Sequence, residues 1–399
     1  MKILEILFWF CLFIMFYSYI GYGILLYLLV SIKRLVTKNS KSSYDTQYEP
    51  EVTLLVTAYN EKDFVEAKVK NSFELDYPKD KIKYLWVTDG SDDGTPEILK
   101  QYKNIKVYHQ NERCGKIAAM NRGIKFVDTP IVIFSDANTN LGKNSVKEIV
   151  KMFSNPKVGC VSGEKRIYSN NADTASGAGE SLYWKYESTL KKWDAELYSA
   201  VGAAGELFAI RTALYQELEN DTLLDDFIIS LRIAMQGYTI QYNPKAYAIE
   251  TASANVKEEL KRKIRISAGG LQSVLRLTPL LNPFKYGVLT FQYISHRVLR
   301  WTLSPLALLM IIPLNILLVF KSAYFFNSDF YTLLLSGQIL FYLSVLIGWF
   351  IENYKTRIKV LFVPYYFFIM NLSVYLGFYR LITSQQSVKW ERAKRAQWA

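Results

Sequence analysis

Residues 82–95 read IKYLWVTDGSDDGT, an apolar run that stops at Asp89 and passes into glycine and acidic residues. Two further acidic clusters follow: Asp136 in Asp-Ala-Asn, and the adjacent pair Asp225 and Asp226. The first two clusters begin where short apolar runs end, and carboxylates at strand ends line a binding crevice rather than a core. A basic segment at residues 262–265 follows the third cluster just before the chain turns hydrophobic. The layout indicates phosphate chemistry at a membrane face.

The composition of the chain indicates a membrane protein. Of its 399 residues, 50% are hydrophobic and 15% aromatic. Four stretches without charge each reach the ~20 residues that span ~30 Å of hydrocarbon: 6–32, 301–320, 330–351 and 360–379. The first is too long for the apolar region of a signal peptide and has no small-x-small cleavage site, so we expect a retained anchor.

The formal net charge of +12 favours a phosphate-rich partner, either a nucleotide or anionic lipid headgroups. Basic loops on the cytoplasmic side of a membrane protein explain the same charge. Lys33, Arg34 and Lys38 follow the first apolar stretch. They predict that residues 40–284 lie in the cytoplasm, with the N-terminus outside. This placement in the cell membrane gives access to activated nucleotides, and no nucleic-acid partner is expected.

The cysteines and histidines restrict the kinds of metal site. Cys11, Cys114 and Cys160 show no repeated spacing, which predicts neither a disulfide framework nor a zinc site. The only histidines are His109 and His296. Any metal must therefore be held by oxygen ligands, which favours Mg²⁺ or Mn²⁺.

Apolar runs and helical patterns alternate between residues 52 and 163. The predicted strands are 52–57, 82–88, 105–109, 131–135 and 158–162; the predicted helices are 64–73, 96–101, 116–126 and 145–153. This alternation predicts an α/β fold, a mostly parallel sheet with helices on both faces. Asn60, Asp89 and Asp136 then fall at three strand ends, where ligands of such sheets bind.

Beyond Gly163 the alternation weakens. Residues 174–197 and 227–236 read as helices, and 207–210 as a strand or helix. Apolar and basic residues interleave with prolines over 271–300, a pattern for helices in the membrane interface. The predicted units are a transmembrane helix at 1–36, a cytoplasmic domain at 37–270, interfacial helices at 271–300, and a transmembrane and interfacial region with a basic tail at 301–399.

Two motifs fit nucleotide and metal binding. Gly90 lets a ligand approach Asp89 closely, so the carboxylate could accept hydrogen bonds from a base or ribose. An ordinary Asp-Gly turn would have the same sequence. Asp136 and Asn138 present oxygens on one side of an extended segment. A divalent cation there could bridge to a diphosphate, or Asn138 could simply cap a helix. Lys116 starts a predicted helix and could bind phosphate or cap it.

Two further motifs fit proton transfer and charge recognition. Adjacent Asp225 and Asp226 raise one another's pKa, which suits a general base, although helix N-termini favour acidic pairs anyway. Arg262 and Arg265 share a helical face and could clamp a diphosphate or meet lipid headgroups. The tail around Trp390 allows the same two interpretations.

Taken in order, these segments resemble the membrane-embedded family 2 glycosyltransferases, which include cellulose, chitin, hyaluronan and poly-N-acetylglucosamine synthases. The resemblance implies a GT-A fold, a Rossmann-like nucleotide-sugar domain. It also implies residue roles. The nucleoside would contact Ala58, Tyr59, Asn60, Glu61 and Asp89. The diphosphate would contact Lys116, Asp136, Arg262 and Arg265, and the metal Asp136 and Asn138. Asp226 would be the base, with Asp225 beside it.

The acceptor would lie near Gly205 and Glu206, although a structural turn explains these two residues nearly as well, and the tail would bring Trp390 close. Two departures from the family pattern bear on this resemblance. Asn138 replaces the second acid of Asp-x-Asp, and Ile266 replaces a tryptophan expected beside the acceptor. The first departure bears on how the metal is bound, and the second bears on whether the polymer is synthesised processively.

The resemblance predicts an inverting transferase that moves a hexose or N-acetylhexosamine from a UDP-sugar to a growing β-linked polysaccharide and couples synthesis to secretion. The enzymatic alternative adds one sugar to a lipid-linked acceptor. The non-enzymatic alternative is a membrane receptor that binds a nucleotide. Four full crossings would place the basic tail outside, against the positive-inside rule. We therefore expect residues 360–379 to lie partly in the interface or to re-enter.

Overall fold

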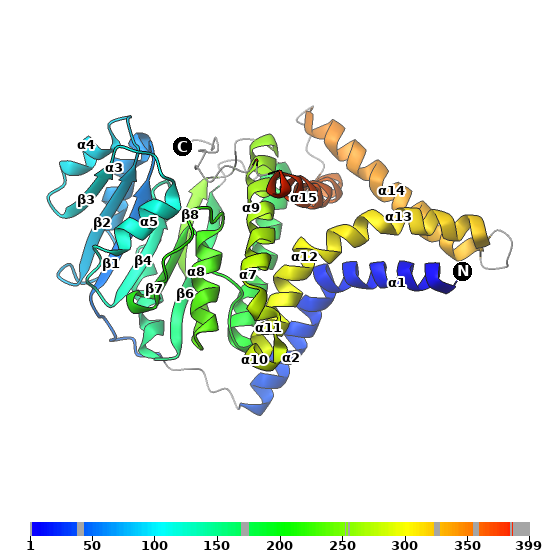
Figure 1. Ribbon diagram of the computed structural model, residues 1–399, viewed down its shortest axis with the longest axis horizontal. Helices are drawn as coiled ribbons and strands as arrows, with labels where there is room; N and C mark the ends of the chain where they lie inside the picture. Colours follow the sequence, from blue (N-terminus) through cyan, green and yellow to red (C-terminus); the bar gives the residue numbers. More distant parts are fainter. Residues whose placement is uncertain are drawn as a thin grey trace.

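The computed structural model describes most of the chain: residues 2–37, 44–168, 175–251, 253, 256–322, 328–353, 359–383 and 385. Figure 1 shows a sheet domain at one end and long apolar helices at the other. Trp390, predicted at the acceptor, lies outside the described residues, as does the rest of the basic tail.

One mixed sheet of eight strands forms the core of the domain, in the order β3-β2-β1-β4-β7-β6-β8-β5. Its strands are β1 Val52–Ala58, β2 Ile82–Asp89, β3 Ile105–Gln110, β4 Ile131–Asp136, β5 Asn140–Leu141, β6 Val158–Tyr168, β7 Leu207–Arg211 and β8 Thr239–Thr251. All five predicted strands are present. Residues 207–210, predicted as strand or helix, form a strand.

The sheet is less parallel than predicted beyond its first half. Strands β3, β2, β1 and β4 are parallel neighbours, but β7 runs antiparallel to both β4 and β6. Strand β8, which pairs parallel to β6, was not predicted. Its register shifts where Asn243 is followed by Pro244, so a bulge interrupts the alternation by which a strand is recognised.

Helices cover both faces of the sheet, as predicted. They are α3 Lys62–Phe73, α4 Thr95–Lys100, α5 Lys116–Ile124, α6 Ser145–Val150 and α8 Asp225–Met235. Alternate residues of β1 enter opposite cores: Leu54 and Val56 pack with Val69 of α3, and Leu55 packs with Met120 of α5. Burial on both faces explains why the central strands read as continuous apolar runs.

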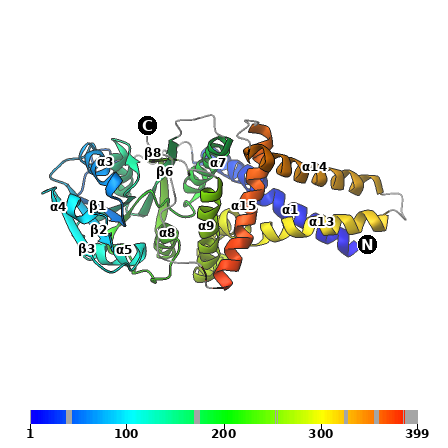
Figure 2. The same cartoon turned by 90° about the horizontal axis from the view of Figure 1, so that it is seen from above.

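Two long helices, α7 Ala175–Leu197 and α9 Val256–Arg276, stand between the sheet and the apolar helices (Figures 1 and 2). Helix α9 continues past the predicted domain boundary at residue 270. Short helical segments then lead toward the apolar end: η4 Thr278–Leu281, α10 Pro283–Tyr286, α11 Val288–Tyr293, η5 Ile294–Val298 and α12 Leu299–Trp301. Two single turns, η2 Lys151–Ser154 and η3 Thr212–Leu214, lie within the sheet domain.

Three helical segments in the described chain are long and apolar enough to cross a membrane: Lys2–Val36, Leu303–Lys321 and Phe330–Ile351. The first was predicted as one anchor, but a π-helical turn, η1 Tyr17–Gly21, divides it into α1 Lys2–Phe16 and α2 Tyr22–Val36. Figure 1 shows α2 leaning away from α1 and toward the domain. Leu26 and Val30 of α2 pack with Leu190 of α7.

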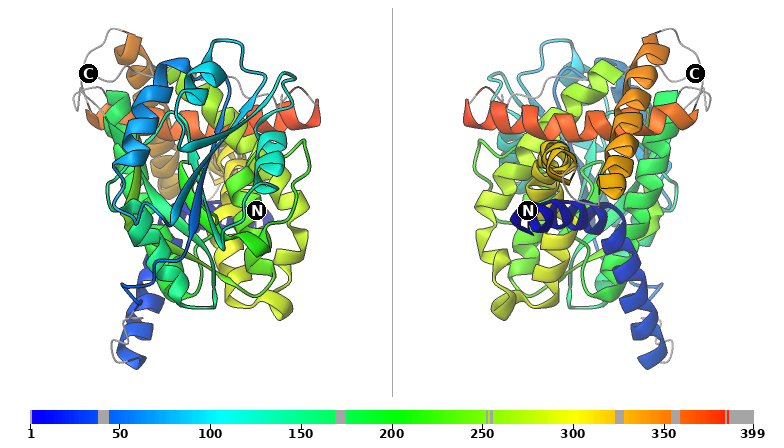
Figure 3. Two further views of the ribbon diagram at one scale, coloured as in Figure 1. Left: turned by 90° about the vertical axis from the view of Figure 1, so that its left-hand side faces the viewer. Right: turned by 90° about the vertical axis from the view of Figure 1, so that its right-hand side faces the viewer.

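The remaining apolar helix takes a different course. Helices α1, α13 Leu303–Ser322 and α14 Ser328–Asn353 extend away from the sheet, whereas α15 Lys359–Ile382 lies across them (Figures 2 and 3). It packs against α9 so closely that a Cβ on Gly377 would lie 2.8 Å from the Ala268 nitrogen. Residues 360–379 thus run in a different direction from the other apolar helices, and their place in the membrane interface stays a prediction.

A buried network of charged side chains joins the apolar end to α7. Glu187, 2% exposed, accepts hydrogen bonds from Arg297 and from Arg300, whose Nη1 lies 3.2 Å from Oε2. His296 lies between two carboxylates, with Nδ1 2.6 Å from Asp194 and Nε2 3.3 Å from Glu187. We call these five residues the α7 joint. Because buried charges are stable only when paired, the joint holds α7 in one position.

Candidate active site

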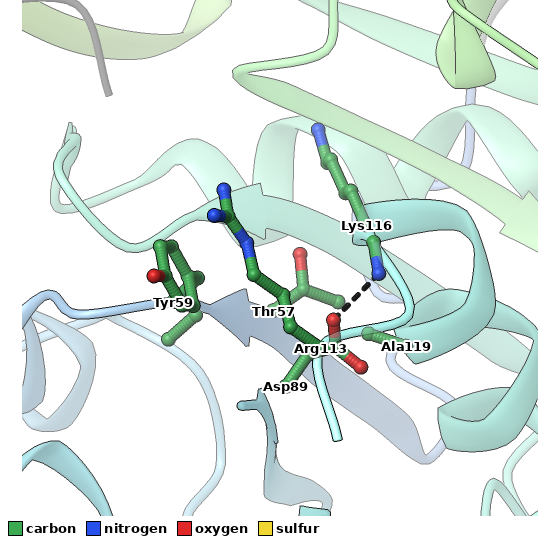
Figure 4. Close-up of a pocket in the computed structure, with 8 residues that line it drawn as sticks. Thr57, Tyr59, Asp89, Arg113, Lys116 and Ala119 are labelled. Atoms are coloured by element: carbon green, nitrogen blue, oxygen red, sulfur yellow. Dashed lines mark hydrogen bonds between the residues drawn. The ribbon is translucent and has the colours of Figure 1, made fainter. Parts of the chain in front are cut away.

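The ends of three neighbouring parallel strands meet at one edge of the sheet. Thr57 of β1 pairs with Asp136 of β4, and Ala58 pairs with Thr88 of β2, next to Asp89. The two aspartates therefore flank the end of β1, as predicted. Figure 4 shows the resulting crevice, which we call the strand-end crevice; its lining residues are Thr57, Ala58, Tyr59, Asp89, Arg113, Gly115, Lys116 and Ala119.

Asp89 is held in place with one carboxylate oxygen left open. It is 3% exposed, and its Oδ2 accepts a hydrogen bond from the Gly115 nitrogen at 2.6 Å (Figure 4). Its Oδ1 accepts none from the described residues and lies 3.7 Å from Arg122 Nη1. An unsatisfied buried acceptor is costly, so Oδ1 is suited to receive an N–H or O–H from a ligand.

Tyr59 and Arg113 form one wall of the crevice. The guanidinium carbon of Arg113 lies 3.8 Å from the centre of the Tyr59 ring, a cation–π contact. The contact requires glycine at position 90: its φ is +69°, and a Cβ there would lie 2.7 Å from Arg113 Cβ. A flat π-system and a planar cation at one wall suit a nucleobase.

Asn60 and Glu61, both predicted at the donor, are part of the scaffold around the crevice. Asn60 adopts a φ of +52°, and its amide bonds Asp92 in both directions, at 2.8 Å and 3.0 Å. The Glu61 nitrogen donates to Thr95 Oγ1 at 3.1 Å, and Glu61 is 1% exposed. These bonds fasten the end of β1 to the loop after β2, so Asn60 and Glu61 hold the position of Asp89.

Lys116 links the crevice to the third acidic cluster. Its Nζ lies 3.0 Å from Asp136 and 3.1 Å from Asp225. Burial opposes its charge, but the two carboxylates outweigh burial and raise the pKa of Lys116. Burial also raises the pKa of Asp136, and Lys116 opposes that rise. The structure thus brings together three predicted residues that are far apart in the sequence.

Asp136 and Asn138 fit a divalent cation. The Asn138 Oδ1 is buried and accepts no hydrogen bond from the described residues, two positions after the Asp136 carboxylate. Oxygen donors of this kind suit Mg²⁺ or Mn²⁺. Within the described chain, His, Cys, Asp and Glu do not gather in threes as a metal cluster. A cation here would therefore depend on these two residues together with oxygens of a ligand.

Asp225 and Asp226 open α8, where the helix N-terminus favours negative charge. Burial first, and then the charge of Asp225, raise the pKa of Asp226 to about 7, while Lys116 acts in the opposite direction. A Cβ on Gly205 would lie 3.3 Å from Asp226 Oδ2. The glycine therefore leaves space beside a carboxylate that can accept a proton near neutral pH.

Glu206 is part of a buried cluster that was not predicted. Lys165 of β6 bonds both Glu206 and Glu250 of β8, the latter at 2.5 Å. Lys165 opposes the effect of burial and holds the pKa of Glu206 below its ordinary value. Neither Lys165 nor Glu250 belongs to a motif, and their pairing depends on the unpredicted strand β8. We call Lys165, Glu206 and Glu250 the acid–lysine cluster.

The two predicted arginines of α9 differ in their surroundings. Arg262 bonds Glu259 one turn earlier, through Nε at 3.0 Å and Nη2 at 2.8 Å. Arg265 lies in the electrostatic field of Asp225 and Asp136, and its pKa is lowered mainly by burial. Arg265 makes no hydrogen bond or ion pair with another described residue, so of the two it is the one available to a ligand.

Comparisons with known proteins point to one family. Residues 53–219 match the model of glycosyl transferase family 2. Poly-β-1,6-N-acetyl-D-glucosamine synthase of Staphylococcus epidermidis is 25% identical over 341 residues, 81% of each chain. The synthase of Staphylococcus aureus is 26% identical over 246 residues, 60% of this chain and 59% of that one.

A solved structure extends the likeness to nearly the whole fold. The mannosyltransferase PcManGT from Pyrobaculum calidifontis, solved with GDP-Man and Mn²⁺, has a TM-score of 0.70 and 22% identity. The match covers 95% of this chain and all of that one. The mixed sheet with its flanking helices is the predicted GT-A fold, and apolar helices accompany it. Residues 53–219 form a domain that matches glycosyl transferase family 2, and the chain as a whole is similar to the poly-β-1,6-N-acetyl-D-glucosamine synthases.

Proposed function

We propose that this protein transfers N-acetylglucosamine from UDP-N-acetylglucosamine to the end of a growing β-linked polysaccharide, with inversion at the anomeric carbon. The likeness to the synthase of Staphylococcus epidermidis over four fifths of both chains supports the sugar and the polymer. The observation that carries the chemistry is the position of Asp226. Its pKa is raised to about 7, Gly205 leaves space beside its carboxylate, and the charge of Lys116 acts on it.

The nucleotide would occupy the strand-end crevice. The open Oδ1 of Asp89 would accept a hydrogen bond from the uracil or ribose, and Tyr59 with Arg113 would contact the base. Lys116 and Arg265 would face the diphosphate with positive charge. Asp136 and Asn138 would hold Mg²⁺ or Mn²⁺, a cation that would supply positive charge near the diphosphate.

The reaction would be a single displacement. Asp226 takes the proton of an acceptor hydroxyl, whose oxygen forms a bond to the anomeric carbon as the bond from that carbon to the phosphate oxygen breaks. UDP leaves with the bonding electron pair, and Lys116 and Arg265 stabilise its charge. Because attack comes from the face opposite UDP, an α-linked donor gives a β-glycoside.

The course of the helices supports one membrane arrangement. We propose that the segment Lys2–Val36 and helices α13 and α14 cross the cell membrane and that α15 lies along its cytoplasmic face, with the catalytic domain in the cytoplasm and the N-terminus outside. Three crossings return the chain to the cytoplasmic side and so satisfy the positive-inside rule for the basic tail. The acceptor end of the site then faces the membrane helices, an arrangement that would allow the polymer to be secreted as it grows.

The test is a donor screen on the full chain in lipid nanodiscs. With Mn²⁺ present, UDP-N-acetylglucosamine should release UDP and yield a long product, and GDP-mannose should not react. Addition of one sugar to a lipid-linked acceptor would instead identify the single-addition enzyme. Donor binding without any release of nucleotide would identify a receptor and contradict the proposal. Protease accessibility of a C-terminal tag in oriented vesicles tests the topology.

A further inference from the structure

Two buried lysines of the domain differ in how they are satisfied. Lys68 of α3 is 1% exposed, and its ammonium donates to Ser135 Oγ at 2.7 Å and to the Thr139 carbonyl at 2.7 Å. Lys191 of α7 is 5% exposed, yet it forms no hydrogen bond or ion pair with any other described residue. Burying an ammonium without a partner is strongly unfavourable. The hydrogen bonds of Lys68 explain its burial as structural, whereas the burial of Lys191 requires another explanation.

The charged groups that act on Lys191 come from four places: Arg297 of η5, Glu187 one turn earlier on α7, Asp226 at the start of α8, and Glu206 before β7. Two of these three acids, Glu187 and Glu206, are already paired with other cations. Glu187 is bonded by Arg297 within the α7 joint, and Glu206 is bonded by Lys165. Asp226 alone has neither an ion pair nor a side-chain hydrogen bond with a described residue.

An unpaired ammonium and an unpaired carboxylate therefore share one interior region without touching each other. A hydroxyl group can bridge such a pair, because it accepts from the ammonium and donates to the carboxylate, each at about 2.8 Å. The space beside Asp226 exists because position 205 is glycine. Helix α7 stands on the side of the site toward the apolar helices (Figures 1 and 2).

We propose that Lys191 is an acceptor-binding residue, whose ammonium donates a hydrogen bond to a hydroxyl or carbonyl oxygen of the acceptor saccharide beside Asp226. This proposal rests on the proposed function. It assigns two cations to opposite sides of the base, Lys116 toward the donor and Lys191 toward the acceptor. Lys191 then keeps the attacked sugar in place while Asp226 takes its proton.

The experiment compares Lys191→Met with wild type in nanodiscs, with UDP-N-acetylglucosamine, Mn²⁺ and a β-1,6-linked N-acetylglucosamine pentasaccharide as acceptor. Loss of a charged hydrogen bond should raise the acceptor KM roughly 10–100-fold and leave the donor KM unchanged. Lys191→Arg should recover part of the loss. The matched control is Lys192→Met, because Lys192 is the exposed neighbour on the same helix.

The pH profile gives a second readout that a purely structural lysine would not affect. The charged and titratable groups around Asp226 are Asp225, Lys116, Glu206, Lys191, Arg265 and Cys160. Lys191 lowers the pKa of Asp226, so its removal should move the acidic limb of the kcat/KM profile to higher pH. Lys191→Gln, which keeps a donor but loses the charge, should shift the limb with a smaller rise in acceptor KM.

An unchanged acceptor KM together with an unshifted acidic limb, in either Lys191→Met or Lys191→Gln, would overturn the proposal. If Lys191→Met fails to fold, the glutamine variant decides by the same two readouts. A wild-type protein that transfers no sugar to the pentasaccharide or to its own polymer contradicts the proposed function instead, so the two failures are distinguishable.

Discussion

The strand-end crevice and the acceptor side of the site are built in opposite ways. The crevice is made from residues directly after parallel strands, so Asp89 and Asp136 are placed by the local chain and by strand register. On the proposed acceptor side, Lys191, Glu206 and Asp226 come from a helix, the segment before β7 and another helix, and not from paired strands. Its geometry therefore depends on how α7 and α8 pack, and on the α7 joint that holds α7.

This difference separates two kinds of damage. Changes in the crevice should weaken donor binding without affecting the rest of the fold, because the strands are buried on both faces and support the loops independently. Changes on the acceptor side should affect acceptor binding, proton transfer or the packing of α7. The predictions below test that separation, from the largest expected effect to the smallest.

Replacing the base should have the greatest effect. Asp226→Asn removes the proton acceptor but keeps the shape, and it should lower kcat by roughly 10²–10⁴-fold while UDP binding persists. Steady-state UDP release and calorimetric UDP binding measure the two effects. Asp221→Asn, at an exposed acid nearby, should behave as wild type. Turnover that survives in Asp226→Asn shows that the base lies elsewhere.

The α7 joint should be the most sensitive structural element. Glu187→Ala leaves Arg297, Arg300 and His296 without their shared carboxylate, and breaking a buried pair costs about 3–5 kcal/mol. We expect a clear fall in the thermal midpoint of unfolding, followed in detergent by fluorescence. Glu196→Ala removes an exposed ion pair of the same helix with Arg34 and should change the midpoint little. Equal shifts for both would show that the joint does not stabilise α7.

The crevice should respond through the donor alone. Asp89→Asn exchanges a carboxylate acceptor for an amide, and hydrogen bonds to charged groups contribute about 1.5–3 kcal/mol, so the donor KM should rise roughly 10–100-fold. The acceptor KM should stay constant. Initial rates over a matrix of donor and acceptor concentrations separate the two. A rise in both constants would mean that the two sides are not independent.

The pH dependence should report the acceptor side. Asp226 acts as a base only when ionised, and its pKa is raised to about 7. The rate should therefore rise with pH through about 7 and then level off. A rate that is already maximal at pH 5 would show that Asp226 carries its charge well below neutrality.

The mildest change concerns the cation. Asn138→Asp adds a second carboxylate beside Asp136, and Mg²⁺ and Mn²⁺ favour charged oxygen ligands. It should lower the Mn²⁺ concentration needed for half-maximal activity, measured by metal titration after chelation. Asn144→Asp, which changes the same residue type a short distance along the chain, should have no such effect. An unchanged Mn²⁺ requirement in Asn138→Asp would exclude position 138 from the metal site.

Features that depend on local sequence were predicted correctly, whereas features that depend on contacts between separate segments were missed. The first strands, the loops after them and the aspartates at their ends were predicted because apolar runs and turn residues are local signals. Strand β8 was missed because Pro244 and a bulge interrupt its pattern. The acid–lysine cluster was missed with it, since Lys165 meets Glu250 only through that strand.

By itself the sequence determined the α/β core, the apolar helices and the presence of aspartates at strand ends, because each of these features depends on a few consecutive side chains. Only the tertiary structure decided that Lys116 joins Asp136 to Asp225, that α15 lies across the other apolar helices, and that Lys191 is buried without a partner near Asp226. These features depend on contacts between distant segments, whose geometry is set by packing rather than by local pattern.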